Sequence, residues 1–379
     1  MKRDDRSVGL VAPQYMNVDE PFLLTCGEQL PEYTLCYETY GTLNAHKDNA
    51  MLICHALSGH AHAAGIHHTE DKKPGWWDHY IGPGKPIDTN RFFVVCCNNL
   101  GGCHGSTGPN SIKPGTTKPY GADFPSVRVR DWVNTQHQLM VHLHIPQWAA
   151  VIGGSLGGMQ VMRWALEYPD CIRYAVVIAS SMKLTAQNIA FNEIARQAIK
   201  RDQAFHNGHY LHHQTQPNDG LSLARMIGHL TYLADDTMDH KFGRALRSGS
   251  FNLGEHEPLE FQVASYLSYQ GKRFTEQFDA NTYLLMTQAL DYFDLAREYQ
   301  HDPVQAFSHA RCPFLVVSFS SDWRFSPKRS QAIVDALISA KKRVAYTNIE
   351  SAHGHDAFLL PNARYEQVLR TYLNHIPIR

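Results

Sequence analysis

Residues 149–159 read A-A-V-I-G-G-S-L-G-G-M, an apolar run that passes through a glycine-rich turn into a helical pattern. The turn contains G-x-S-x-G with Ser155 at its centre. In a strand-turn-helix elbow the bend is so sharp that its flanking positions must lack Cβ atoms, and the serine hydroxyl is left exposed. The helix that follows favours negative charge developing nearby. The stretch therefore predicts a nucleophilic Ser155, and the alternative is a tight turn in which Ser155 only caps the helix.

Apolar runs alternate with amphipathic stretches on both sides of this turn. Strands are expected at 51–54, 92–96, 149–152, 174–179, 314–319 and 343–349, and helices at 131–143, 159–168, 327–340 and 363–374. Alternation of this kind is typical of an α/β protein with a mostly parallel sheet covered by helices. Near the N-terminus, 22–26 and 33–40 alternate in hydrophobicity and are expected to pair as an antiparallel hairpin at the sheet edge.

A long helical stretch separates the expected strands at 174–179 and 314–319. Its best helical patterns lie at 188–201, 221–234, 258–271 and 281–300, with a polar, His-rich loop expected at 206–219. The stretch is too long for a simple crossover between two strands. We therefore expect a core domain made of residues 1–180 and 314–379, with residues 181–313 inserted as a helical cap.

A serine hydroxyl needs a base and an orienting carboxylate, and in this elbow context they follow in the order Ser, Asp or Glu, His. Asp322 comes just after the expected strand at 314–319, and His355 follows the last strand in S-A-H-G-H-D. The carboxyl ends of parallel strands are where active sites gather. Alternatively, Asp322 caps the next helix, or His353 is the base.

The composition limits the possible partners. The chain has 379 residues, 43% of them hydrophobic, and 35 Lys+Arg balance 36 Asp+Glu. A chain this apolar is not largely disordered, and its net charge of −1 offers no basic field for nucleic acid or an anionic membrane. Eight scattered cysteines without a C-x-x-C pair, and an N-terminus without an apolar signal segment, favour a reduced, cytoplasmic location.

The order of these motifs resembles the homoserine O-acyltransferase family of methionine biosynthesis, within the α/β-hydrolase superfamily. The matching blocks span most of the chain: Y-E-T-Y-G at 37–41, H-A-L-S-G at 55–59, G-P-G-K-P-I-D-T at 82–89, N-L-G-G-C at 99–103, G-S-T-G-P at 105–109, the elbow at Ser155, and G-H-D-A-F-L at 354–359. The resemblance implies an α/β-hydrolase fold with Ser155, Asp322 and His355 as a catalytic triad.

The resemblance also implies substrate contacts. Arg225, in A-R-M-I-G-H at 224–229, and Asp356 are expected to bind homoserine. A guanidinium suits the α-carboxylate of homoserine, and a carboxylate suits its α-ammonium. A solvated helix face for Arg225 and a helix cap for Asp356 are the alternatives. The oxyanion hole is expected to use the backbone N–H of Leu156, which follows the nucleophile, and by resemblance that of Leu57.

The expected reaction is a ping-pong transfer of an acyl group from an acyl-CoA to the hydroxyl of L-homoserine. Arg324, two residues after Asp322, favours succinyl-CoA over acetyl-CoA because only succinyl ends in a carboxylate, and the family resemblance points the same way. In the alternative, Arg324 faces solvent or pairs within the protein. A homodimer formed through the cap helices is a family expectation. The rival interpretations are an esterase or thioesterase with the same triad and a non-catalytic binding protein, which predicts a degraded triad.

Histidine is unusually frequent, at 23 residues, and invites a metal interpretation. Two segments are crowded with it: His55, His60, His62, His67 and His68 in one, and His206, His209, His212 and His213 in the other. Neither contains H-E-x-x-H or a Cys/His finger spacing. We therefore expect no metal and no cofactor, acyl-CoA being a co-substrate.

Overall fold

One sheet forms the centre of the molecule in the computed structural model, which describes residues 5–247 and 261–379. Its strands are β1 (Gln14–Val18), β4 (Tyr33–Tyr40), β5 (Ala50–Cys54), β8 (Phe93–Cys97), β9 (Ala150–Gly154), β10 (Ala175–Ile178), β11 (Phe314–Phe319) and β12 (Val344–Ile349). They lie in the order β1-β4-β8-β5-β9-β10-β11-β12. β4 pairs antiparallel with β1 and β8, and every later pairing in the sheet is parallel. The predicted mostly parallel α/β sheet is confirmed, and the six strands predicted from residue 51 onward lie within two residues of their expected bounds.

The expected hairpin near the N-terminus is wrong in its pairing. Segment 22–26 contributes only β2 (Phe22–Leu23), which pairs with β3 (Gln29–Leu30) across a turn at Gly27. β4 instead pairs with β1, so β1 and not 22–26 forms the edge of the large sheet. β1 had no strand signal because only Met16 of its five residues is buried. A further short pair, β6 (Ile81–Gly82) with β7 (Ile87–Asp88), lies outside the main sheet.

Helices cover both faces of the sheet. α1 (Val129–His142), α2 (Leu156–Glu167), α8 (Pro303–Ser308) and α9 (Pro327–Ser339) share one hydrophobic cluster with the sheet, and α10 (Ala363–Asn374) belongs to another. Neighbouring strand residues alternate between the clusters: Val151 belongs to the first and Ile152 to the second. This alternation follows from the pleat, which points successive side chains to opposite faces. The sheet is therefore buried on both sides, as its continuous apolar runs predicted.

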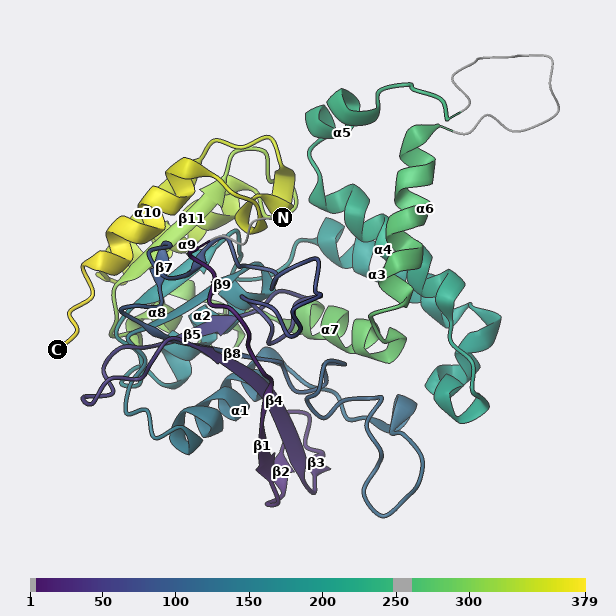
Figure 1. Cartoon of the computed structure of the whole chain (residues 1–379), viewed down its shortest axis with the longest axis horizontal. Helices are drawn as coiled ribbons and strands as arrows, with labels where there is room; N and C mark the ends of the chain where they lie inside the picture. Colours follow the sequence, from purple (N-terminus) through teal and green to yellow (C-terminus); the bar gives the residue numbers. More distant parts are fainter. Residues whose placement is uncertain (1–4, 248–260) are drawn as a thin grey trace.

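The described residues between β10 and β11 are mainly helical. It forms α3 (Ala186–Lys200), α4 (Asn218–Tyr232), α5 (Asp235–Phe242), α6 (Gln262–Thr275) and α7 (Ala280–Tyr292), with 3-10 turns η2 (Gln203–Gly208), η3 (Tyr210–His213) and η4 (Arg297–Tyr299). Helices α3 to α6 lie together on one side of the sheet-bearing part, away from α9 and α10 (Figure 1). This arrangement is that expected of a cap, and the boundaries 181–313 stay a prediction.

Three details of this region differ from the sequence expectations. The helix expected at 281–300 ends at Tyr292, because Phe293 is extended and the Leu295 N–H donates to the Met182 carbonyl at 2.9 Å. The first three positions of the helix expected at 258–271 lie outside the described residues. The expected loop at 206–219 forms short 3-10 turns before α4 begins.

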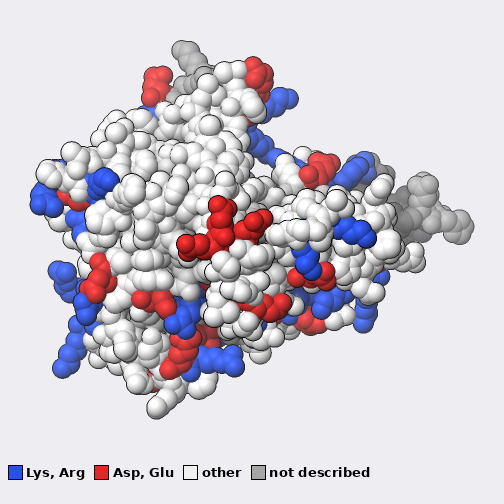
Figure 2. All heavy atoms as spheres, turned by 90° about the horizontal axis from the view of Figure 1, so that it is seen from below, with Lys and Arg blue, Asp and Glu red and all other residues white. Residues whose placement is uncertain are grey.

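Charge is mixed on the surface. Figure 2 shows acidic and basic residues interspersed over the face in view, separated by uncharged areas. Among the described residues, none of the helices combines the length and the apolar character needed to cross a bilayer.

Candidate active site

Ser155 stands at the elbow between β9 and α2. Its backbone is strained, with φ of 57° and ψ of −120°, a region that non-glycine residues seldom adopt. The glycines two residues before and after Ser155 have no room for a side chain. A Cβ on Gly157 would lie 2.0 Å from the Cys54 carbonyl oxygen, and one on Gly153 would lie 2.4 Å from the Gly157 carbonyl. The glycines of the motif therefore permit the bend that holds the Ser155 hydroxyl at the end of the strand.

Two loops at the same edge of the sheet bring Asp322 and His355 to Ser155. Asp322 follows β11, and His355 lies in η5 (Gly354–Leu359) after β12. The Nε2 atom of His355 is 2.8 Å from the Ser155 Oγ, and its Nδ1 atom is 2.7 Å from the Asp322 Oδ2. The structure thus joins the three expected residues in one hydrogen-bonded chain, and His353 lies exposed outside it.

Aromatic rings and a backbone donor fix this chain of hydrogen bonds. Phe325 stacks on the His355 imidazole, with ring centroids 4.8 Å apart and planes 25° apart. The Phe325 N–H also donates to Asp322 Oδ1 at 2.8 Å, so both carboxylate oxygens are held. Gly354 precedes the histidine at φ of 62°, and a Cβ there would lie 2.4 Å from the Tyr232 carbonyl oxygen. The last turn of α4 therefore rests directly against the His355 loop.

The two backbone N–H groups expected to form an oxyanion hole lie at the ends of neighbouring strands. Leu156 is the first residue of α2, and Leu57 follows β5. Within the described residues, no hydrogen bond engages either N–H. The turn that carries Leu57 is anchored by His55: its Nε2 atom accepts the Asn99 N–H at 3.0 Å, and its carbonyl accepts from the Gln160 side chain at 3.2 Å. Burial lowers the pKa of His55 to about 4, so this anchor is neutral.

Arg225 and Asp356 come to the site from different elements, α4 and η5. Arg225 projects from α4, with Nη1 3.5 Å from the Ser58 Oγ and its guanidinium 4.6 Å from the Phe274 ring centre. Burial raises the pKa of the Asp356 carboxyl, and electrostatic interactions with His355 and Arg225 oppose that rise. The charge of Arg225 affects the pKa of Asp356, but no ion pair joins the two side chains in the described structure. This separation leaves each charge available to a ligand.

Arg324 is buried, with 8% of its surface exposed. Its guanidinium donates to the Asn192 side-chain oxygen at 3.1 Å and to the Thr231 hydroxyl. Its partners in the described residues are neutral, and no carboxylate pairs with it. Burying a guanidinium without a counter-charge is costly. The alternative of a solvent-facing Arg324 is wrong, whereas the alternative of pairing within the protein holds for two neutral partners, Asn192 and Thr231.

Tyr232 is a site residue that the sequence reasoning missed. Its ring centre lies 6.0 Å from the His355 ring centre, 5.2 Å from the Arg324 guanidinium and 6.0 Å from that of Arg225. Tyr232 follows Arg225 by seven residues, which is two turns of α4 and therefore the same helix face. That spacing could have indicated from the sequence that Tyr232 lies near Arg225 in the site.

Comparisons with known proteins agree with this fold. A family model described as the alpha/beta hydrolase fold matches residues 49–361. The homoserine O-succinyltransferases of Cellvibrio japonicus and Saccharophagus degradans are 67% and 64% identical to the chain over 372 and 373 residues, and each match covers 98% of both sequences.

Solved structures extend the comparison. The homoserine O-acetyltransferase of Bacillus anthracis matches with a TM-score of 0.89 at 28% identity, covering 97% of this chain and 98% of that one. Esterase E22 matches with a TM-score of 0.86 at 29% identity, covering 96% and 100%. The elbow, the sheet order and the matched model define an α/β-hydrolase-fold protein. Within that class, the chain belongs to the homoserine O-acyltransferase family, as its motifs predicted.

Proposed function

We propose that the protein transfers a succinyl group from succinyl-CoA to the hydroxyl of L-homoserine. The observation that carries the proposal is the buried Arg324 guanidinium, whose hydrogen-bond partners among the described residues are neutral. It lies 5.2 Å from the same Tyr232 ring that neighbours His355. Its charge supports a donor that ends in a carboxylate. The succinyltransferase names of the relatives at 67% and 64% identity support the same choice.

In the first half-reaction, His355 takes the proton of the Ser155 hydroxyl as the serine oxygen attacks the thioester carbonyl. The Asp322 carboxylate, 2.7 Å from Nδ1, stabilises the imidazolium that forms. The C–S bond breaks, coenzyme A leaves with the proton held by His355, and Ser155 carries the succinyl ester. The N–H groups of Leu57 and Leu156 would stabilise the oxyanion, each by about 3–4 kcal/mol.

In the second half-reaction, L-homoserine binds with its carboxylate on Arg225 and its ammonium on Asp356. Within the part of the chain that the structure describes, neither group forms an ion pair, which supports this placement. His355 takes the proton of the homoserine hydroxyl, whose oxygen attacks the Ser155 ester; the bond to the Ser155 oxygen breaks, and the serine recovers its proton. Neither half-reaction requires a metal or a cofactor. Water competes with homoserine, so a cap at residues 181–313 that narrows the approach would favour transfer.

Hydrolysis is the second candidate function, because esterase E22 shares this fold over nearly the whole chain. The decisive experiment measures thiol release from succinyl-CoA and from acetyl-CoA, with and without L-homoserine, and identifies the acylated product by mass spectrometry. Transferase activity with succinyl-CoA requires release that depends on homoserine and yields O-succinylhomoserine. Equal release without homoserine would identify a thioesterase, and a preference for acetyl-CoA would overturn the choice of donor.

Cytoplasmic location and homodimer formation belong to the same proposal. Acyl-CoA and homoserine are metabolites of the cell interior, which supports the location. Exposed Tyr269 on α6 supplies apolar surface for a partner cap. Light scattering on the purified protein checks the dimer: a mass near twice 42.9 kDa is expected, and a monomer at micromolar concentration would contradict it.

A further inference from the structure

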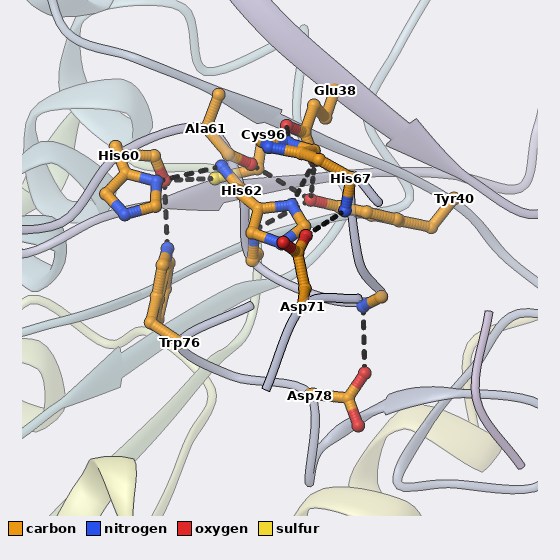
Figure 3. Close-up of polar contacts among 12 residues, drawn as sticks. Glu38, Tyr40, His60, Ala61, His62, His67, Asp71, Trp76, Asp78 and Cys96 are labelled. Carbon is orange, nitrogen blue, oxygen red and sulfur yellow. Dashed lines mark hydrogen bonds and ion pairs between the residues drawn. The ribbon is translucent and has the colours of Figure 1, made fainter. Parts of the chain in front are cut away.

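Three side chains that the proposed reaction does not use converge beside β4. Glu38 lies in the middle of β4, while His62 and His67 lie in the segment that follows β5. The Nδ1 atom of His62 is 2.9 Å from Glu38 Oε2, and the Nε2 atom of His67 is 2.6 Å from Glu38 Oε1. The three donor atoms all lie within 4.8 Å of one another. Figure 3 shows the two imidazoles meeting the carboxylate from the loop side. We refer to Glu38, His62 and His67 as the Glu38 cluster.

The surroundings hold the Glu38 cluster in place. Glu38 is 1% exposed, and the Tyr40 hydroxyl lies 2.9 Å from its Oε2 atom while accepting the Ala63 N–H at 2.7 Å. The backbone N–H of His67 donates to Asp71 at 3.0 Å, which holds the loop at this residue. The Tyr40 contact orients the Glu38 carboxylate, as the hydrogen-bond partners of metal ligands do. His67, whose side chain is 36% exposed, leaves the cluster open to solvent on one side.

We infer that the Glu38 cluster binds one Zn²⁺-class transition-metal ion. Two imidazoles and one carboxylate form a ligand set that zinc takes in proteins, with water in the fourth position. Mg²⁺ and Ca²⁺ prefer sites made of oxygen atoms, so they fit this mixed set poorly. The buried Glu38 carboxylate would neutralise part of the ion's charge.

The present spacing is close to what coordination requires. Donor atoms on a tetrahedral ion at about 2.0–2.2 Å stand roughly 3.3 Å apart. The two contacts to Glu38 would open slightly, the two imidazole nitrogens would close, and the ion would replace the hydrogen bonds at 2.6 and 2.9 Å. Any proton on a ligating nitrogen would be released, because a metal ligand must be deprotonated at the donor atom.

A bound ion would serve the structure and not the reaction. His62 and His67 share their loop with Leu57, which follows the same strand β5. The ion would therefore tie this loop to β4 and stiffen the turn that carries the Leu57 N–H. Because the ion binds only the folded chain, it should raise Tm. From the sequence no metal is expected, because Glu38 lies 24 residues before His62 and the histidine spacing alone fits neither H-E-x-x-H nor a Cys/His finger.

The test uses the full chain, stripped with a chelator, dialysed and titrated with Zn²⁺ alone. Calorimetry and elemental analysis give affinity and stoichiometry, and Co²⁺ absorption reports the ligand set. The variants are His62→Ala, His67→Ala and Glu38→Gln, and the matched control is His68→Ala, which removes an exposed neighbouring imidazole. Circular dichroism checks that each variant is folded, and His67→Ala should fold because its side chain is partly exposed.

The expected result is one ion bound by the wild type and by His68→Ala, with at least about tenfold weaker binding in His67→Ala and His62→Ala. Zn²⁺ should raise Tm of the wild type and of the control, and not of these variants. Failure of the wild type to take up Zn²⁺ would show that the cluster is only a hydrogen-bonded network. Equal binding by wild type and His67→Ala, or equal loss in His68→Ala, would also overturn the inference.

Discussion

The ring of Phe325 lies against the imidazole of His355, with centroids 4.8 Å apart, and the backbone N–H of the same phenylalanine binds the carboxylate that orients this histidine. One residue therefore controls the plane of the imidazole and the position of Asp322. The ring of His355 can then present Nε2 to Ser155 only in the orientation that its Nδ1 bond to Asp322 sets.

Replacing Asp322 by Asn should lower kcat by about 10⁴, because the amide no longer holds the imidazole in the required tautomer or stabilises its positive form. The KM for homoserine should change little, since Asp322 does not contact the proposed acceptor site. Steady-state thiol release measures both constants. A loss of less than tenfold would contradict the role proposed for Asp322.

Replacing Arg324 by Gln should lower kcat/KM for succinyl-CoA, because a charged hydrogen bond to the donor's terminal carboxylate is lost. Such a bond contributes about 1.5–3 kcal/mol, or roughly 10- to 150-fold in kcat/KM. The kcat/KM for acetyl-CoA should not change. The control is Arg329→Gln, which removes an exposed charge on α9. If the ratio of the two donors does not change, Arg324 does not select the acyl group.

Replacing Asp356 by Asn should raise the KM for homoserine by at least tenfold, because the ammonium loses its ionic partner. Release of thiol without homoserine should stay the same, since Asp356 makes no hydrogen bond to Ser155, Asp322 or His355. The ratio of transfer to hydrolysis separates these effects. Equal loss of both reactions would mean that Asp356 supports the triad and not the acceptor.

The stability of the protein should fall as pH drops from about 6.5 towards 4. His55 is buried with its pKa lowered to about 4, while in the unfolded chain it titrates near 6.5, so in this window the unfolded state binds the proton and the folded state does not. The full effect of one such histidine is about 3 kcal/mol. Burial also lowers the pKa of His60, to about 3, and adds to the slope.

The contribution of His55 is measured by comparing the pH dependence of stability in the wild type and in a His55 variant. Denaturant unfolding of wild type and His55→Asn at several pH values gives the free energy of unfolding of each. The variant should be less stable at pH 7 and should lose less stability on acidification. Parallel pH curves for the two proteins would show that His55 does not contribute to the slope.

The sequence was most informative where local pattern and tertiary structure coincide. β11 and α10 have the bounds that their apolar patterns predicted, because both bury a continuous or periodic apolar face. The elbow at Ser155 was predictable because steric limits allow few residue types there. Asp322 and His355 followed from chain order, and the structure places His355 beside that serine and Asp322 beside His355.

Elements that depend on distant partners were not predictable in the same way. β1 is mostly exposed and is stabilised by its pairing with β4. Its sequence therefore shows no apolar alternation from which a strand could be predicted. α7 ends early because the chain after it pairs with Met182, about 110 residues before. Tyr232 belongs to the site through its contacts with Arg324 and His355, which lie far along the chain.

Helix α4 touches two loops of the candidate active site at once. Arg225 reaches Ser58 in the Leu57 turn, and the carbonyl of Tyr232 lies against Gly354 beside the histidine. A redesign that changes the acceptor by moving this helix would disturb both loops together. New acceptors are therefore easier to reach by exchanging side chains on a fixed α4 than by altering its length or tilt, which restricts the mutational routes by which this protein can diverge.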